Sequence, residues 1–202
     1  MPRWAEAQSA VEGAIAIVRR DPDADRFFDL SADSFWRSFG AFLYIAPLQM
    51  ILVLAERRLA LSMSEAPVAE IPSATVMMVT ELIASIIAWG AYPLAMFALA
   101  PQFGLAKRFA GYVIVYNWTS LAIVLAVLPP YLLFALGVFP PGIVLAINFM
   151  ILLAVLWFRW TLATDVLGAP GLTAAGFVVL DILLGLFISL GVAALIVGQP
   201  AG

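Results

Sequence analysis

Five long apolar stretches constrain what this chain can fold into. They cover residues 38–55, 75–99, 110–128, 142–158 and 172–197. A stretch of about 20 apolar residues can cross the hydrocarbon core of a bilayer as an α-helix, because a helix satisfies its own backbone N–H and C=O groups. The pattern therefore predicts an all-α integral membrane bundle of about five transmembrane helices, with four or six spans as alternatives.

The composition agrees with a membrane protein and disfavours most enzyme chemistry. Of the 202 residues, 64% are hydrophobic and 11% are charged, whereas soluble domains are roughly half apolar and a quarter charged. The chain has no histidine and no cysteine, so the usual general base, the usual metal ligands and thiolate nucleophiles are missing. We therefore expect no enzyme activity, no metal site and no cofactor. The net charge of −3 gives no reason to expect a nucleic-acid partner.

The segment between the third and fourth stretches is harder to assign. Residues 129–141 read PPYLLFALGVFPP. The segment is too short to span a bilayer, and the proline pair at each end should break a helix. We predict a turn or a shallow interfacial segment, with part of a span as the remaining alternative.

The basic residues give a predicted orientation. Lysine and arginine concentrate in the cytoplasmic loops of membrane proteins. Only Arg57 and Arg58 fall on the side away from the N-terminus. The others fall on the N-terminal side: Arg3, Arg19, Arg20, Arg26, Arg37, Lys107, Arg108 and Arg159. We therefore expect a cytoplasmic N-terminus and a C-terminus on the opposite side of the membrane.

Residues 1–34 are predicted to form an N-terminal arm, and residues 35–202 the transmembrane domain. Four apolar residues near the start share one helical face: Trp4, Val11, Ile15 and Val18. This stripe indicates an amphipathic helix, which lies either on the inner leaflet or against the protein's own bundle.

The acidic stretch after this helix resembles a calcium-binding loop only in part. Asp21, Asp23 and Asp25 have the right spacing, but Arg26 stands where the loop needs glycine and Ala32 where it needs glutamate. We interpret the stretch as a hinge at the membrane entrance. Ser31 is predicted to cap the helix that follows.

Polar side chains inside the apolar stretches suggest two layers. Ionisable groups in a membrane are costly and are functional candidates by default. Asp181 lies about 13 Å and Asn117 about 10 Å from the inner ends of their stretches, at ~1.5 Å per residue, so they are predicted to share an inner layer, with Tyr116 and Thr119 nearby in sequence. The second layer lies six residues from the outer ends of other stretches and comprises Glu81, Gln49 and Asn148.

Both acids lie on helical faces made of small residues. On the fifth stretch the small residues follow Asp181 at intervals of four, and on the second stretch they share a face with Glu81. Small side chains let helices approach closely in a bilayer, so both acids are predicted to face protein. The predicted helix-packing residues are Gly185, Ser189, Ala193, Ala84 and Ala88.

Two functions are open for this set of residues. In the favoured one, the polar groups fix helix packing at about 0.5–2 kcal/mol each. The protein is then a non-enzymatic scaffold, assembly factor or accessory subunit that contacts lipid and either a membrane-protein partner or a second copy of itself. In the alternative, Asp181 and Glu81 belong to a proton or cation path in a small transporter or channel component. The layers lie about 10 Å apart in depth, so such a path needs water or serines, for which Ser85, Ser120 and Ser189 are available.

Two segments carry a resemblance to a known family. FGLAKRFAGYVIVYNWTSL, residues 103–121, has a glycine and a basic pair before an aromatic-rich segment, and GLTAAGFVVLDILLGL opens the fifth stretch. These segments, together with the order of an N-terminal arm followed by five spans, resemble the bacterial branch of the Yip1-like five-span membrane proteins. The resemblance covers residues 35–197. The resemblance implies a non-catalytic bundle in a bacterial inner membrane. Tyr116 runs into NWTS where members often carry proline. The acidic-tyrosine motif of the GTPase-binding eukaryotic members is not evident, so no GTPase partner is inferred.

Overall fold

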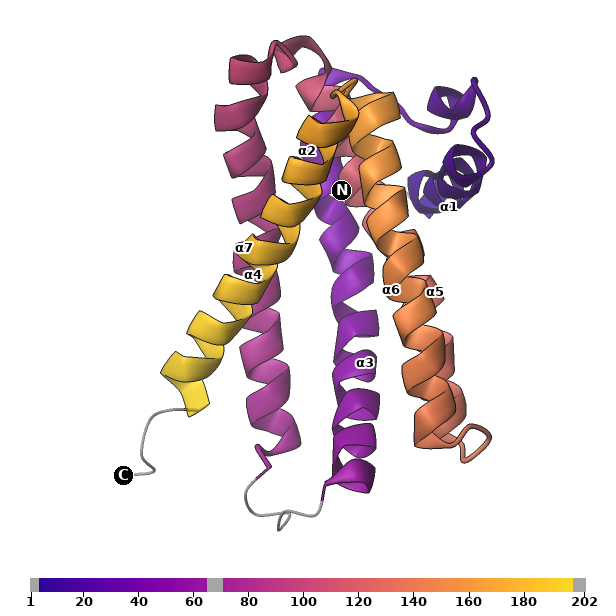
Figure 1. Cartoon of the computed structure of the whole chain (residues 1–202), viewed down its shortest axis with the longest axis vertical. Helices are drawn as coiled ribbons and strands as arrows, with labels where there is room; N and C mark the ends of the chain where they lie inside the picture. The colour runs from indigo at the N-terminus through magenta and orange to yellow at the C-terminus, as the bar shows by residue number, and fades with distance from the viewer. Residues whose placement is uncertain (1–3, 65–70, 198–202) are drawn as a thin grey trace.

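The computed structural model describes residues 4–64 and 71–197, and every regular element within them is helical (Figure 1). The arm contains α1 (Trp4–Val18) and η1 (Ala24–Phe27). The membrane domain contains α2 (Ala32–Ser38), η2 (Phe39–Ala41), α3 (Phe42–Met63), α4 (Ala74–Leu99), η4 (Ala100–Phe103), α5 (Ala106–Ala135), α6 (Pro141–Thr161), the π-helical turn η5 (Leu162–Val166) and α7 (Gly171–Val197).

Five helical segments are long and apolar enough to cross a membrane: Ala32–Met63, Ala74–Phe103, Ala106–Ala135, Pro141–Val166 and Gly171–Ile196. They run alternately up and down (Figure 1). The arm, α2, the α4–α5 connection and the α6–α7 connection lie at one end, which we call the arm end. The end of α3, the start of α4 and the α5–α6 connection lie at the far end. The predicted all-α membrane bundle is confirmed, and the protein is an integral membrane protein.

The structure corrects the predicted end of the third span. The proline pair at residues 129–130 was expected to break the helix, but α5 continues through both prolines to Ala135. In a membrane, neighbouring helices and local adjustments compensate for the backbone hydrogen bonds that proline removes. The break comes instead at Gly137, which has a φ of 77°. The second proline pair marks a helix boundary, as predicted. Pro140 occupies the N-cap position of α6, and Pro141 is the first residue of this helix.

The first span is also longer than predicted. Residues 38–55 were assigned to it, but α2, η2 and α3 follow one another from Ala32 to Met63. Glu56, Arg57 and Arg58 therefore belong to the last turns of α3 rather than to a loop. Arg57 Nε donates to the Pro72 carbonyl oxygen at 3.0 Å, so this cation fixes the end of α3 to the segment before α4.

Helix α5 is the central helix of the bundle at the arm end. All residues from Tyr112 to Leu121 are buried, because α1, α2, α3, α6 and η5 pack around this helix. Helix α7 is much less enclosed. Its buried residues within the described part of the chain are Ala174, Phe177 and Val192, and its densest packing is with α4. Helix α7 therefore has few buried residues, and α4 provides most of its packing.

The predicted amphipathic helix forms as α1, and it packs against α5. It does so through a face of small residues: Ala7, Ala10, Gly13, Ala14 and Ala16 are all buried. Gly13 is needed there, because a Cβ atom at this position would lie 2.5 Å from the Phe28 ring. In the predicted apolar stripe, Trp4, Ile15 and Val18 are exposed, although the Trp4 ring lies 5.9 Å from the Tyr44 ring of α3.

Charged groups hold the arm on the first span. Arg37 contacts Glu6 at 3.0 Å and Asp29 at 2.8 Å. The Ser31 backbone N–H donates to Asp29 Oδ1 at 3.0 Å. This hydrogen bond is the main reason that the pKa of Asp29 lies below its usual value. The predicted cap is confirmed, because the Ser31 hydroxyl accepts a hydrogen bond from the Ser34 backbone N–H at 3.2 Å. These contacts tie the arm to α2, and the interpretation of the acidic stretch as a hinge stays a prediction.

Candidate functional site

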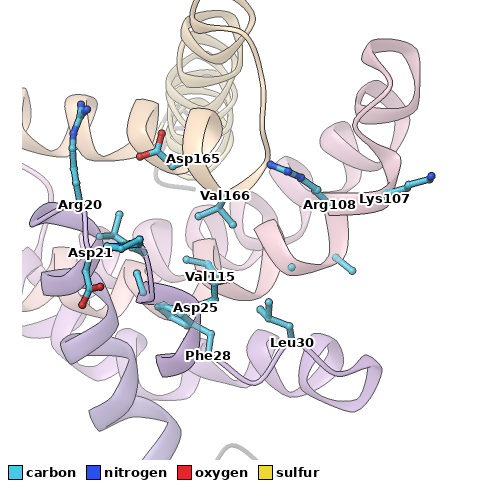
Figure 2. Close-up of a pocket in the computed structure, with 15 residues that line it drawn as sticks. Arg20, Asp21, Asp25, Phe28, Leu30, Lys107, Arg108, Val115, Asp165 and Val166 are labelled. Atoms are coloured by element: carbon cyan, nitrogen blue, oxygen red, sulfur yellow. The ribbon is translucent and has the colours of Figure 1, made fainter.

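Two cavities lie beside groups of polar and charged side chains. One, of about 680 Å³, opens at the arm end between the arm and the start of α5 (Figure 2). The other, of about 220 Å³, lies between the transmembrane helices, and its lining includes Asp181. The second cavity is lined by Asp181 and Gln49, two of the polar residues that the sequence places inside the spans, so we describe it as the candidate site.

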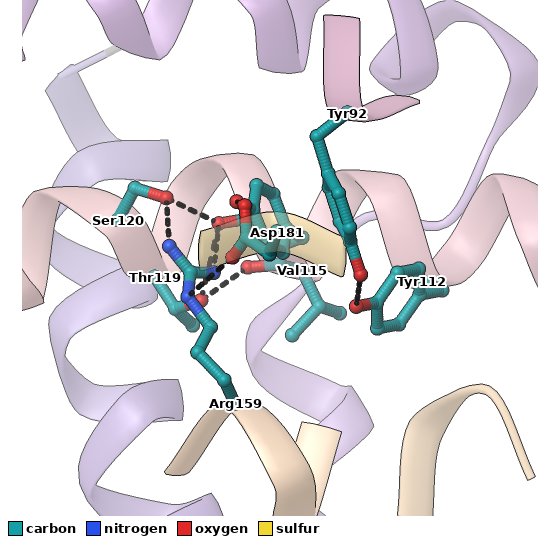
Figure 3. A network of polar contacts seen from close by, with 8 residues as sticks. Tyr92, Tyr112, Val115, Thr119, Ser120, Arg159 and Asp181 are labelled. Carbon is teal, nitrogen blue, oxygen red and sulfur yellow. Dashed lines mark hydrogen bonds and ion pairs between the residues drawn. The ribbon is translucent and has the colours of Figure 1, made fainter. Parts of the chain in front are cut away.

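An ion pair forms one wall of this cavity (Figure 3). Tyr116 on α5 donates its hydroxyl proton to Asp181 Oδ1 on α7 at 2.7 Å. Arg159 on α6 places its Nε 3.9 Å from Asp181 Oδ2. The Arg159 side chain is 12% exposed and that of Asp181 is 23% exposed. The Asp181 carboxylate is therefore only partly buried. Its distance of 3.9 Å from Arg159 is long for an ion pair.

Helix α5 holds Arg159 in place independently of Asp181. The guanidinium carbon lies 3.7 Å from the centre of the Tyr116 ring, a distance at which the ring face attracts a cation. Nη1 donates to the Tyr116 carbonyl oxygen at 3.3 Å, and Nη2 donates to Ser120 Oγ at 2.8 Å. The Ser120 hydroxyl in turn donates to the same carbonyl oxygen at 2.8 Å. Arg159 is thus a fixed cation with several partners on α5.

Two further tyrosines extend this network. The hydroxyls of Tyr92 on α4 and Tyr112 on α5 are 2.7 Å apart and hydrogen-bonded. The Tyr92 ring stacks on the Tyr116 ring, with centroids 4.7 Å apart. Tyr92 and Tyr112 are almost completely buried, at 4% and 1% exposure. The network therefore connects α4, α5, α6 and α7 at one level of the bundle.

The cavity has space and polar lining for water. At about 30 Å³ of liquid per water molecule, its volume of about 220 Å³ can hold several. Ser85 and Ser120 contribute hydroxyls to the lining. Gln49 contributes its amide, and the buried Gln49 Oε1 has no hydrogen-bond partner within the described residues. A buried polar atom without a partner is costly, and so little of this oxygen is exposed that water in the cavity cannot reach it.

A second group of acids lies beyond Ser85. The Ser85 hydroxyl donates to Glu81 Oε1 at 3.0 Å. Glu56 on α3 interacts electrostatically with Glu81, and its carboxylate is hydrogen-bonded to Tyr131 on α5. The polar groups therefore continue from Asp181 through the cavity and Ser85 to two glutamates. Sequence reasoning missed Glu56 because it ended the first span at residue 55, eight residues before the end of α3 at Met63.

The predicted inner layer forms around a different residue of α5. Asn117 is completely buried but donates to Ser38 Oγ at 3.0 Å on the first span. Its neighbour Tyr116 is the residue that bonds Asp181. Consecutive residues of a helix point about 100° apart. The predicted depth of the contact on α5 was therefore correct to within one residue, but Asn117 lies on a different face of α5 from the one that contacts Asp181. Thr119, named with Tyr116 at the sequence level, donates to the Val115 carbonyl oxygen of its own helix.

The predicted outer layer is only partly brought together. Gln49 lines the same cavity as Asp181 and Ser85. Asn148 donates to the Val144 carbonyl oxygen of its own helix, at 3.0 Å. Glu81 reaches the cavity only through Ser85.

Arg159 was assigned to a loop, and this assignment was wrong. It lies in the last turns of α6, because the helix runs to Thr161 rather than ending at residue 158. The available signal was the sequence WFRWT, residues 157–161, which keeps an arginine between aromatic residues without any helix breaker. Arg159 therefore belongs to the buried network and not to the set of loop cations.

The small-residue stripes lie along the α4–α7 contact, but not all of their members pack closely. Ala84 is buried at 3% exposure. Ala88 and Gly185 line the cavity, and a Cβ atom at Gly185 would meet nothing within 4 Å. Ser189 is exposed, and Ala193 is half-buried. At Gly185 the absence of a side chain therefore leaves open space instead of a tight helix contact.

No family model, curated protein or solved structure matches this chain. The resemblance to the Yip1-like family therefore stays a prediction that rests on the quoted segments.

Proposed function

We propose that the protein is a small transporter in which Asp181 takes up and releases a proton as part of the transport step. The observation that carries this proposal is the partly exposed Asp181 carboxylate, which lies in a polar cavity between the spans and faces a fixed arginine. Carboxylates inside membranes mark proton relays and ion pathways in transporters and pumps. A simple packing contact does not need an adjoining cavity.

The ion pair suggests how protonation changes the structure. While Asp181 is ionised, it attracts Arg159 and accepts the Tyr116 hydroxyl proton. When Asp181 is protonated, the attraction to Arg159 ends, yet Arg159 keeps its partners on α5. Helix α7 loses a contact that ties it to α5 and α6, and it has few other buried residues. Protonation should therefore let α7 move relative to α5 and α6.

Polar groups on the far side of the cavity support a route for protons. Ser85, Glu81 and Glu56 continue the polar path away from Asp181. Serine hydroxyls and water can pass protons between carboxylates that are too far apart for direct contact. The alternative scaffold hypothesis depends on the small stripe as a docking face, and Gly185 of that stripe lines a cavity within the chain.

We further propose that the arm end faces the cytoplasm of a bacterial inner membrane. Lys107 and Arg108 begin α5 at the arm end, whereas Arg57 and Arg58 lie near the far end of α3. Arg159 is buried and no longer counts as a loop cation. Without it, lysine and arginine still concentrate at the arm end, which is the side expected to face the cytoplasm.

Proton flux in proteoliposomes tests the proposed function. We expect purified wild-type protein to dissipate an imposed pH gradient faster than protein-free liposomes, as followed by an enclosed pH-sensitive dye. Asp181→Asn should reduce this flux at least ~10-fold, since the amide keeps the shape of the carboxyl group but does not titrate. Asp23→Asn is the matched control, because Asp23 is 77% exposed in the arm.

Reconstitution yield and size-exclusion profile separate function from folding in this assay. Wild-type flux in well-folded Asp181→Asn protein would refute the proposal. A loss of flux that only matches the fraction of misfolded protein would instead support a packing role for Asp181.

A further inference from the structure

The cavity at the arm end is separate from the proposed proton site and has a different lining. It lies between the end of α1, η1, the start of α5 and the turn η5 (Figure 2). Ile17, Phe28 and Val115 contribute apolar surface. Arg20, Lys107 and Arg108 contribute positive charge. Its volume of about 680 Å³ lies within the range of small-molecule sites.

The three cations are not neutralised by the protein. Within residues 4–64 and 71–197, no carboxylate oxygen lies within 4.0 Å of the charged nitrogens of Arg20, Lys107 or Arg108. In Figure 2, Arg20 lies on one side of the cavity, and Lys107 and Arg108 lie on the other. A ligand between them would meet positive charge from both sides.

The start of α5 adds to this positive field. Leu105 occupies the cap position and makes no side-chain capping bond, and the first turn has no acidic residue. The N-terminus of a helix carries partial positive charge, so acids are favoured there and cations are unfavourable. Lys107 and Arg108 reverse this preference. An anion at this position would satisfy both the helix end and the two side chains.

The backbone at Arg20 provides an independent observation. Arg20 has a φ of 54° and is the one non-glycine residue with positive φ in the described part of the chain. It ends α1, where its N–H bonds the Ile17 carbonyl oxygen and the next N–H bonds that of Ala16. Glycine normally occupies this position, since side chains are strained there. The strain is consistent with a requirement for the Arg20 side chain at the cavity.

Acids on the same lining restrict the ligand further. Asp21 is paired with Arg26 at 3.1 Å, but Asp25 has no ion-pair partner within the described residues. Asp165 accepts a hydrogen bond from the Thr164 hydroxyl. These carboxylates repel a ligand with several negative charges and attract an ammonium group. The lining therefore fits one phosphate together with one amine.

We propose that this cavity binds the headgroup of a phospholipid that carries both a phosphodiester and an amine. Lys107 and Arg108, which lie on the same side of the cavity, bind the phosphate, and Arg20 adds positive charge from the opposite side. Asp25 and Asp165 face the ammonium group. The apolar residues contact the glycerol and the first part of the acyl chains. The location fits, because the cavity lies at the ends of the spans, where headgroups meet the protein.

Binding of short-chain lipids to the full-length, delipidated protein in detergent tests the proposal. The probes are a dihexanoyl glycerophospholipid with an ethanolamine headgroup, its glycerol-headgroup counterpart and inorganic phosphate, with native mass spectrometry and calorimetry as readouts. The ethanolamine lipid should bind most tightly. Lys107→Gln combined with Arg108→Gln should weaken its binding by about 25-fold, at about 5-fold for each basic residue. Arg58→Gln, at the far end of α3, should leave binding unchanged.

A second variant keeps the test decisive if the double variant folds poorly. Asp25 is exposed in the arm, and Asp25→Asn should reduce the preference for ethanolamine over glycerol headgroups without changing the melting temperature. Equal binding by wild-type protein and a well-folded double variant would overturn the site. Tight binding of inorganic phosphate that displaces the lipid would overturn the lipid assignment, and a preference for the glycerol headgroup would overturn the role of the acids.

Discussion

Replacing Asp181 with alanine should lower the free energy of unfolding of the bundle by about 3 kcal/mol, since this leaves Arg159 as a buried cation without its carboxylate. The side chain of Arg159 is 12% exposed, so water cannot take over the lost interaction fully. The Tyr116 hydroxyl would also lose its acceptor. Equilibrium unfolding with SDS in mixed micelles measures the change.

Removing both charges should cost much less than removing one. In a double variant with Asp181→Leu and Arg159→Met, no buried charge remains, and apolar side chains of similar volume occupy the site. We expect its stability within about 1 kcal/mol of the wild type. Ser189→Ala is the matched control on α7, because Ser189 is exposed, and it should change stability by less than about 0.5 kcal/mol. If the double variant were as unstable as the single one, the ion pair would not be the interaction that matters.

The second large effect is expected at Gly185. A leucine at this position should abolish most of the proton flux, by about 10-fold or more, while leaving the bundle folded. The physical reason is that Gly185 lines the cavity and a Cβ atom there meets no other atom within 4 Å. We therefore expect the added side chain to take up space beside Asp181 and to displace the water that a proton path requires. The pH-gradient assay in liposomes measures the flux.

Ser189→Leu is the control for this substitution. It adds the same side chain to α7 one turn further toward the C-terminus, on an exposed position, and should leave flux unchanged. The scaffold hypothesis gives a different expectation, namely that Gly185→Leu disrupts helix contacts. Loss of the folded bundle in this variant would support close packing at Gly185, and normal flux would remove the cavity from the mechanism.

The spans were predictable from sequence because membrane insertion depends on local hydrophobicity. The second and fifth stretches, 75–99 and 172–197, differ by one residue from the starts of α4 and α7. The cap at Ser31 was likewise predictable, since capping involves residues close in sequence. The proline pair at residues 129–130 was misjudged, because the rule that proline ends a helix holds best where no neighbouring helices support the backbone.

The partners within the site were much less predictable. Counting residues from the end of a span gives depth, but a contact also depends on rotation about the helix axis. Asp181 therefore bonds Tyr116 rather than the adjacent Asn117. Arg159 was missed because small errors at the end of a helix decide whether a residue belongs to a loop or to the bundle. The cavity itself depends on how α4 and α7 lie relative to α5, which no single stretch of sequence specifies.

The central claim is that Asp181 takes up and releases a proton while the bundle stays folded. Infrared spectroscopy of the carboxyl stretching bands in reconstituted protein tests it most directly, with the amide band reporting helix content in the same sample. We predict that acidification produces a protonated-carboxyl band that is absent from Asp181→Asn protein, at constant helix content. The claim would be contradicted if no band dependent on Asp181 appeared across the pH range in which the bundle remains folded.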